Sequence, residues 1–292
     1  MRAASPCTGI CKIDGTTGWC LGCGRSRLEM DDWRIRSKGW RQRIWKKIPQ
    51  RLDDLGVTCR RFPWTTEEIR NFVLSSLSNR EGTWVMGIVG ALAGFKAGNC
   101  APNRVDCIDE TVISYTQNGA IRLLINDNVR ALTFDTLNGN SSPRVVLAVK
   151  RDRGRLPMST SVADLGDDPN PLIQDNGQRL FDLGLGRKEA RFCVRVNKST
   201  SERILNACIG ITFSDALPRI TRPLLDDSPT RVVETALGRI EVQGQIPPSN
   251  ASSPVGPHTH LSPNHLSSGR TLPIGMELPR SYLPGAIFYP NK

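Results

Sequence analysis

Four cysteines fall within seventeen positions near the start of the chain, with the spacing Cys7-x3-Cys11-x8-Cys20-x2-Cys23. Two close pairs joined by a short loop are what a four-thiolate site needs, because each pair brings two ligands to one side of a metal. A structural zinc ion and an iron–sulfur cluster both accept four thiolates, so the spacing does not choose between them. The sequence therefore predicts that these four residues hold zinc or an iron–sulfur cluster.

Two alternatives to a metal site, disulfide bonds and four unrelated buried thiols, are less well supported by the sequence. The first residues, MRAASPCTG, lack the apolar segment of a secretory signal, so we expect a cytoplasmic location, where disulfides are rare. The cysteine segment is also rich in glycine and offers no core in which four unrelated thiols would be buried. In the stretch CLGCG, Gly22 and Gly24 are expected to allow the positive φ of a tight turn, which aims backbone N–H groups at the sulfur atoms.

Residues 5–52 resemble a short bacterial four-cysteine family, a domain of unknown function often labelled a predicted iron–sulfur protein. The matching positions include the cysteines, the loop glycines and the IPQRL end of the segment: Cys7, Cys11, Cys20, Cys23, Asp14, Gly18, Gly22, Gly24, Arg25, Glu29 and Trp33. This resemblance implies a metal or cluster site at the four cysteines and no established reaction.

All three histidines of the chain lie in the stretch GPHTHLSPNHL, as His258, His260 and His265. In an extended segment the first two point to the same side, as two metal ligands or a ligand and a base would. Two histidines are short of a catalytic zinc site, which Glu241 or Glu234 could complete. The alternative is that they are surface or locally hydrogen-bonded loop residues.

The C-terminal part of the chain is similar to an uncharacterised bacterial domain with a G-P-H-T-H-L-x-P signature. The residues that carry this resemblance are RVVETALGRIEVQGQIPP and SPVGPHTHLSP, and it extends back to about Trp84. A further histidine of that pattern falls where this chain has Leu272, which weakens the case for a working metal site there. The resemblance implies no established activity.

Two helices are expected directly after the cysteines. Ser26 and Glu29 form a capping box for a short helix, and Ser37 is placed to begin a second. Apolar residues at helical spacing predict one packed face of the second helix: Trp40, Ile44, Ile48, Leu52 and Leu55. Pro49 lies inside this pattern, so we expect the helix to end or kink at Ile48.

The opposite face of this segment is basic and consists of Arg34, Arg36, Lys38, Arg41, Arg43, Lys46, Lys47 and Arg51. Such a face next to a cysteine motif can bind nucleic acid, can dock an acidic protein partner, or can be a solvated helix surface. Acidic residues bracket the run and no named nucleic-acid motif is present, so nucleic acid is not the favoured partner.

Charge is unevenly distributed over the 292 residues. The net charge is +11, and residues 1–61 carry 14 lysines and arginines against six acidic residues. This asymmetry marks a boundary near Arg60 and predicts a four-cysteine module with a basic helix over residues 1–61 and a larger domain over residues 62–292. No run of about 18 apolar residues is present, so no transmembrane helix is expected.

The larger domain shows several signs of antiparallel strands. Hairpins are expected over residues 111–125, 129–151 and 230–247, and Thr65 with Glu68 forms a capping box for a helix. The Pro/Ser-rich residues 157–171 are expected to form a loop. This pattern indicates an α+β fold with an antiparallel or mixed sheet and a few helices.

Five cysteines lie outside the opening cluster. Cys193 and Cys208 stand in apolar runs and are expected to be small buried residues. Cys59 flanks the charge boundary. Cys100 and Cys107 occupy a loop-like stretch, where they could pair or bind a ligand, and the sequence assigns them no role.

These features lead to three hypotheses about function. The first is a cytoplasmic metalloprotein whose four-cysteine module is joined to an α+β binding or interaction domain. A site closed by four thiolates would be structural or would transfer electrons. The alternatives are an enzyme that uses His258 and His260, and a nucleic-acid-associated regulator that uses the basic helix.

Overall fold

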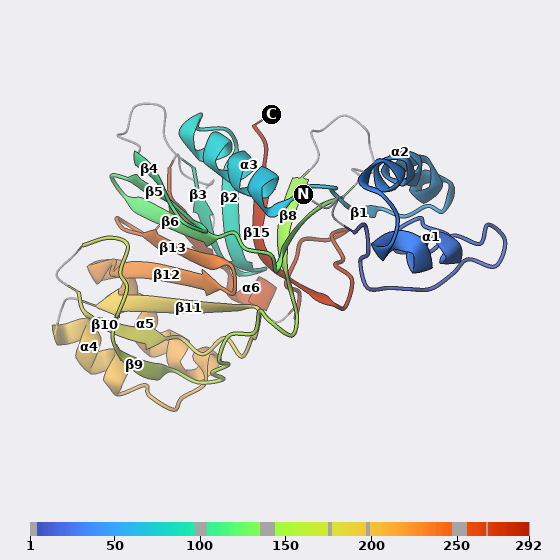
Figure 1. Ribbon diagram of the computed structural model, residues 1–292. Coiled ribbons are helices and arrows are strands. Elements are labelled where there is room, and N and C mark those ends of the chain that lie inside the picture. The colour runs from blue at the N-terminus through green and yellow to red at the C-terminus, as the bar shows by residue number, and fades with distance from the viewer. Residues whose placement is uncertain are drawn as a thin grey trace.

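The computed structural model describes residues 5–96, 104–134, 144–174, 177–196, 199–246, 256–266 and 268–291. A short cysteine-rich segment with helices comes first, and two sheets with few helices follow (Figure 1). Every strand pair between named strands is antiparallel. The predicted α+β fold is therefore confirmed, and the sheets are antiparallel.

The described helices are α1 (Arg27–Asp31), the 3-10 helix η1 (Asp32–Arg34), α2 (Lys38–Asp54), α3 (Thr66–Ser78), α4 (Ser199–Asn206), α5 (Phe213–Asp227) and α6 (Pro263–Leu266). Three of them, α1, α2 and α3, begin where the sequence predicts caps. Capping boxes at Ser26/Glu29 and Thr65/Glu68 start α1 and α3. The side chain of Ser37 accepts a hydrogen bond at the start of α2.

Pro49 does not end α2, so of the two outcomes expected at Ile48, an end or a kink, the end is wrong. The helix continues to Asp54. Ile44, Ile48 and Leu52 lie on the same buried face on both sides of the proline. Their packing holds the helix together where the proline removes one backbone hydrogen bond.

One sheet has seven strands in the order β1-β7-β8-β15-β2-β3-β14. These strands are β1 (Cys59–Arg61), β7 (Val129–Phe134), β8 (Arg144–Lys150), β15 (Tyr282–Tyr289), β2 (Thr83–Ile88), β3 (Ala91–Phe95) and β14 (His258–Leu261). The sheet thus joins a strand next to the cysteine segment to the last strand of the chain.

The other sheet has eight strands in the order β4-β5-β6-β13-β12-β11-β10-β9. They are β4 (Arg104–Ile108), β5 (Thr111–Thr116), β6 (Gly119–Leu124), β13 (Gly238–Val242), β12 (Thr230–Thr235), β11 (Ala190–Val196), β10 (Arg179–Asp182) and β9 (Ala163–Asp167). The three predicted hairpins are present as β5–β6, β7–β8 and β12–β13. The expected loop over residues 157–171 instead contains β9.

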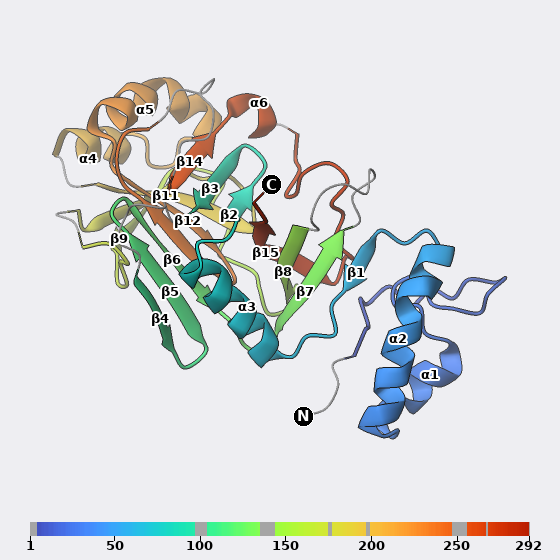
Figure 2. The ribbon, with the colours of Figure 1, turned by 90° about the horizontal axis from the view of Figure 1, so that it is seen from above.

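The main core lies between the two sheets, where β2 and β3 pack on β11, β12 and β13. Helix α3 contacts β4, β5 and β7, so it bridges both sheets. In Figures 1 and 2 the helices α1 and α2 lie at one end of the molecule, and α4 and α5 lie at the opposite end. None of the helices in the described ranges is long and apolar enough to cross a membrane.

Candidate metal centre

The cysteine segment folds back on itself as a small antiparallel loop. Isolated bridges pair Ile13 with Cys20 and Trp19 with Ser26. The Oδ2 atom of Asp14 accepts hydrogen bonds from the backbone N–H groups of Thr16 and Thr17, at 3.1 and 2.7 Å, and so shapes the turn between them. This fold brings the second cysteine pair back toward the first.

The two cysteine pairs contact each other through Thr8 and Gly22. The Thr8 hydroxyl donates a hydrogen bond of 3.0 Å to the carbonyl oxygen of Gly22. A Cβ atom on Gly22 would lie 2.4 Å from Thr8 Oγ1 and 2.8 Å from Ile10 Cβ. The expected positive φ is present at Gly24 but not at Gly22. Glycine is required at position 22 by close approach of the first pair's loop, a non-local contact that local turn patterns do not reveal.

Nitrogen donors face three of the sulfur atoms. Backbone N–H groups of Gly22 and Gly9 donate to the Sγ atoms of Cys20 and Cys7, each over 3.4 Å. The Nε atom of Arg25 donates to Cys23 Sγ over 3.4 Å. Such donors stabilise thiolates and are typical of the surroundings of metal-bound sulfur.

The surroundings shift the pKa values of the two thiols of the second pair, Cys20 and Cys23, in opposite directions. The pKa of Cys20 is lowered to about 5 by its hydrogen bond with Cys23, together with the N–H of Gly22 and the charge of Arg25. The same shared hydrogen bond, together with burial, raises the pKa of Cys23. Of the two thiols, Cys20 is thus the one whose thiolate the surroundings favour.

The four thiols lie as two pairs. Cys20 and Cys23 are buried, Cys7 is half-buried and Cys11 is exposed. Within the described ranges, no group of three or more Cys, His, Asp or Glu side chains is arranged to hold a metal ion. The donor types nevertheless fit zinc or an iron–sulfur cluster, because four thiolates carry more negative charge than the metal neutralises and Arg25 lies buried beside them.

Helix α2 is joined to the cysteine segment by an ion pair and a hydrogen bond. Trp33, Ile44, Ile48 and Leu52 form a small core of their own. The guanidinium of Arg51 pairs with Glu29 at 2.6 Å and donates to the carbonyl oxygen of Gly24 at 3.0 Å. The predicted apolar face of α2 is thus confirmed.

Two residues of the predicted basic face are not on the solvent side. Arg41 is buried and donates to the carbonyl oxygen of Trp33 over 3.2 Å. Arg51 is half-buried against Glu29. Their long side chains reach around the helix to satisfy polar groups of the preceding turns, which helical periodicity alone does not predict.

The last strand of the chain holds the first cysteine pair. The hydroxyl of Ser281 donates to the carbonyl oxygen of Thr8 over 2.8 Å. The hydroxyl of Tyr282 and the guanidinium of Arg61 both donate to the carbonyl oxygen of Cys7, over 3.3 and 3.4 Å. The cysteine segment is therefore attached to the seven-stranded sheet by polar contacts.

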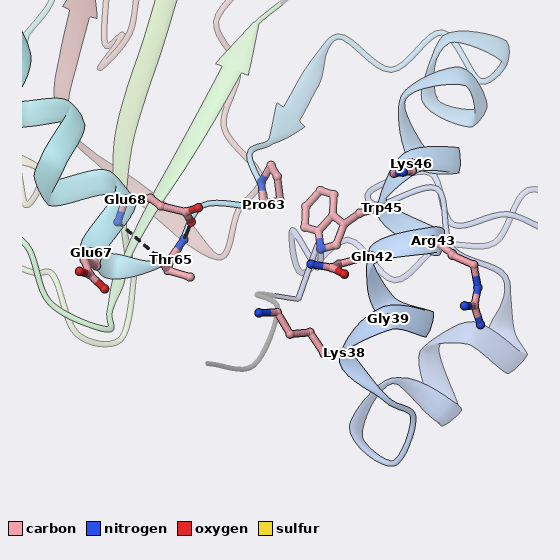
Figure 3. A pocket seen from close by; sticks show the side chains of 10 residues that line it. All are labelled: Lys38, Gly39, Gln42, Arg43, Trp45, Lys46, Pro63, Thr65, Glu67 and Glu68. Atoms are coloured by element: carbon pink, nitrogen blue, oxygen red, sulfur yellow. Dashed lines mark hydrogen bonds between the residues drawn. The ribbon is translucent and has the colours of Figure 1, made fainter.

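A cavity of about 720 Å³ separates α2 from the start of α3. Figure 3 shows Lys38, Gln42 and Trp45 directed from α2 toward Pro63, whereas Arg43 points away. Glu67 lines the opposite wall. Lys38 and Glu67 therefore lie on opposite walls of this cavity.

The histidines are placed on β14, which pairs with β3. His258 and His260 are half-buried on either side of the buried Thr259, and the Nδ1 atom of His258 lies 3.0 Å from the carbonyl oxygen of Gly256. His265 is exposed in α6. No third ligand joins the two histidines within the part of the chain that the structure describes.

The predicted carboxylates for the histidines lie in a different environment. Glu241 is fully buried and accepts hydrogen bonds from Arg195 Nη2 at 2.9 Å and from the backbone N–H groups of Leu172 and Ile173 at 2.9 and 3.0 Å. Glu234 pairs with Arg239 at 3.2 Å. Both belong to an ionic network on the eight-stranded sheet.

This network was not expected from the sequence. Arg195 and Arg239 both pair with the buried Asp168, which lies just after β9. The available signal was a charged residue at alternate positions of otherwise apolar strands, as in ARFCVRV and GRIEV. Its partner, Asp168, came from the segment expected to be a loop.

The remaining cysteines are spread over the chain. Cys193 and Cys208 are fully buried, as predicted. Cys107 is exposed on β4, and Cys59 is half-buried on β1. The expectation for Cys100 lies outside the described residues.

Comparisons with known proteins identify both regions. The family of unknown function DUF6925 matches residues 68–292, and the proteins of unknown function DUF1289 match residues 5–52. Uncharacterized protein YdhL of Escherichia coli K12 and of Shigella flexneri are each 46% identical over 48 residues, which are 16% of this chain. The chain spans 60% of the length of these curated relatives. No solved structure matches the chain.

Proposed function

We propose that this chain, which belongs to the DUF6925 family of unknown function, is a metalloprotein whose DUF1289-like module binds zinc or an iron–sulfur cluster. The ligands are Cys7, Cys11, Cys20 and Cys23. The proposal includes a division into the four-cysteine module at residues 1–61 and an α+β binding domain at residues 62–292.

The observation that carries this proposal is the set of donors around the sulfur atoms. Two backbone N–H groups and one guanidinium face three of the four thiols, and all three donors come from the cysteine loops themselves. Loops that merely contained unrelated thiols would have no reason to direct donors at sulfur. The contact between Thr8 and Gly22 also keeps the two pairs on one side of the segment.

The role we propose is structural or electron-transferring. Four protein thiolates fill the coordination positions of zinc and leave none for a substrate. A cluster held by the same ligands would exchange electrons, with its potential tuned by N–H···S hydrogen bonds. The buried Arg25 offsets the negative charge in either case.

Purification without oxygen, followed by metal and sulfide analysis and an absorption spectrum, tests the proposal. Iron with sulfide and a broad visible band would support the electron-transfer role, and a colourless protein with about one zinc ion per chain would support the structural role. A protein with neither metal would contradict the proposal.

Nucleic-acid binding by α2 is a second candidate. Arg43, Lys46 and Lys47 are exposed, and none of them forms an ion pair with a described acidic residue. Binding should weaken with salt, and neutralising the three residues should reduce that salt dependence. If the face docks a protein instead, the variant with the three residues neutralised should bind an acidic protein less well than the wild type does.

If this variant and the wild type bind a single-stranded oligonucleotide with the same affinity, nucleic-acid binding by α2 is contradicted.

A further inference from the structure

A second cavity, of about 650 Å³, lies beside the one in Figure 3, and the two share Thr65 and Glu67. Three arginines from three different elements line it: Arg61 on β1, Arg70 on α3 and Arg130 on β7. The cavity adjoins the cysteine segment, since Arg61 also donates to the carbonyl oxygen of Cys7. Three carboxylates, those of Glu67, Glu110 and Asp127, also line the cavity, so the hydrogen-bonding capacity of the arginines distinguishes it rather than its net charge.

Arg61 and Arg130 lie on the same face of the seven-stranded sheet. Arg61 is directly opposite Leu132, and Arg130 precedes Leu132 by two residues, so both side chains leave the sheet in the same direction. The two guanidinium groups therefore line the same cavity from neighbouring strands.

The arginines retain unused hydrogen-bonding capacity. The Nε atoms of Arg61 and Arg70 are buried and have no hydrogen-bond partner among the described residues. Buried donors without partners are uncommon and costly. An oxyanion in the cavity would supply the missing acceptors.

The carboxylates that line the cavity form no ion pair with the three arginines in the described part of the chain. Across the described ranges, none of the three forms an ion pair. Asp127, which precedes β7 and lines the cavity, instead accepts a hydrogen bond of 2.6 Å from the hydroxyl of Thr66. The guanidinium of Arg130 donates to the carbonyl oxygens of Asp127 and Val129, which hold it in place without cancelling its charge.

We infer that this cavity binds a small molecule through one oxyanion group, a phosphate or a carboxylate. Guanidinium groups bind both through paired N–H donors. The volume is within the range of about 300–1,000 Å³ that small-molecule sites occupy. Glu67, Glu110 and Asp127 also line the cavity and would repel a polyanion, so a ligand with a single anionic group fits better than a nucleic-acid backbone. Trp64 provides an aromatic surface for the rest of the ligand.

Titration of the full-length protein with phenyl phosphate and with benzoate, at constant ionic strength, tests this inference. Benzamide, which has the shape of benzoate without its charge, is the matched ligand control. We expect saturable binding of at least one anion and little binding of benzamide. A preference for phenyl phosphate identifies a phosphate site, and a preference for benzoate identifies a carboxylate site.

The decisive variant is Arg70→Gln, because Arg70 makes no described contact whose loss would disturb the fold. Affinity should fall about tenfold, the usual loss for a hydrogen bond to a charged group. Arg61→Gln should have a similar effect, and the exposed Arg153→Gln should have none. The inference is overturned if neither anion binds, if benzamide binds equally well, or if both cavity variants retain full affinity. These results do not depend on metal content, so this site and the metal site can fail separately.

Discussion

The hydroxyl of Thr8 donates a hydrogen bond to the carbonyl oxygen of Gly22 over 3.0 Å, and this contact joins the loop of one cysteine pair to the loop of the other. Thr8 is almost completely buried. A buried hydroxyl that bonds a backbone carbonyl fixes both loops, because neither group can turn to water. The relative position of the two pairs therefore depends on a residue that is not itself a metal ligand.

The first prediction concerns Gly22→Ala. The added methyl group would stand 2.4 Å from Thr8 Oγ1 and push the two loops apart. We expect a loss of about 1–3 kcal/mol in the free energy of unfolding, as for other overpacked sites. Urea denaturation measures this loss, and metal content should fall with it.

Gly15→Ala is the matched control. A Cβ atom at position 15 would meet nothing within 4 Å, and the residue has no positive φ. If close approach is the reason for glycine at position 22, Gly22→Ala should be much less stable than Gly15→Ala. Equal stability of the two would contradict this explanation.

The second prediction concerns the pair between Glu29 and Arg51, which ties α1 to α2. Burial alone would raise the pKa of Glu29, but the hydrogen bonds from Arg51 and the backbone of Ser26, with the charge of Arg51, outweigh it and lower the pKa below its ordinary value. The pair therefore stabilises the fold above the unfolded pKa, and this contribution is lost as pH falls through the lower folded pKa.

Glu29→Gln should cost about 1–3 kcal/mol at neutral pH, because it leaves Arg51 half-buried without its counter-charge. The difference between wild type and variant should shrink as pH drops below about 4. Unfolding curves across this pH range measure it. A difference that stays constant down to low pH would show that the Glu29 charge is not responsible.

The third prediction concerns the ionic network of the eight-stranded sheet. Glu241→Gln leaves Arg195 buried with one carboxylate fewer and should destabilise the protein by about 3–5 kcal/mol. Glu202→Gln, at a partly exposed position paired loosely with Arg179, should change stability by no more than about 0.5 kcal/mol. Thermal unfolding of both variants checks this, and a mild effect of Glu241→Gln would mean that the network contributes little.

Local signals in the sequence predicted much of the fold. The capping boxes at Ser26 and Thr65 and the hairpin turn at Asn118 depend on neighbouring residues, so the sequence displays them directly. The pairing of β15 with both β8 and β2 could not be seen in this way, because its partners are distant along the chain. Pro49 shows the limit of a local rule when tertiary packing is strong.

In the candidate site, too, local features could be predicted from the sequence and contacts between distant residues could not. The four cysteines and the N–H donors of their turns follow from spacing. The contacts of Cys7 with Arg61 and Tyr282 join residues that are up to 275 positions apart, and no sequence pattern indicates them. Similarly, β14 places His258 against Gly94 of β3, whereas the carboxylate of Glu241 accepts a hydrogen bond from Arg195.

The central claim is that the four cysteines of the N-terminal segment hold the metal, and the metal-to-protein ratio of two variants tests it most directly. Cys20→Ser with Cys23→Ser removes the second pair, and Cys107→Ser removes an exposed thiol elsewhere as the control. We predict about one zinc ion or one cluster per chain in the wild type and in Cys107→Ser, and a loss of nearly all metal from the double variant. Metal retained by the double variant, or absent from the wild type, would contradict the claim.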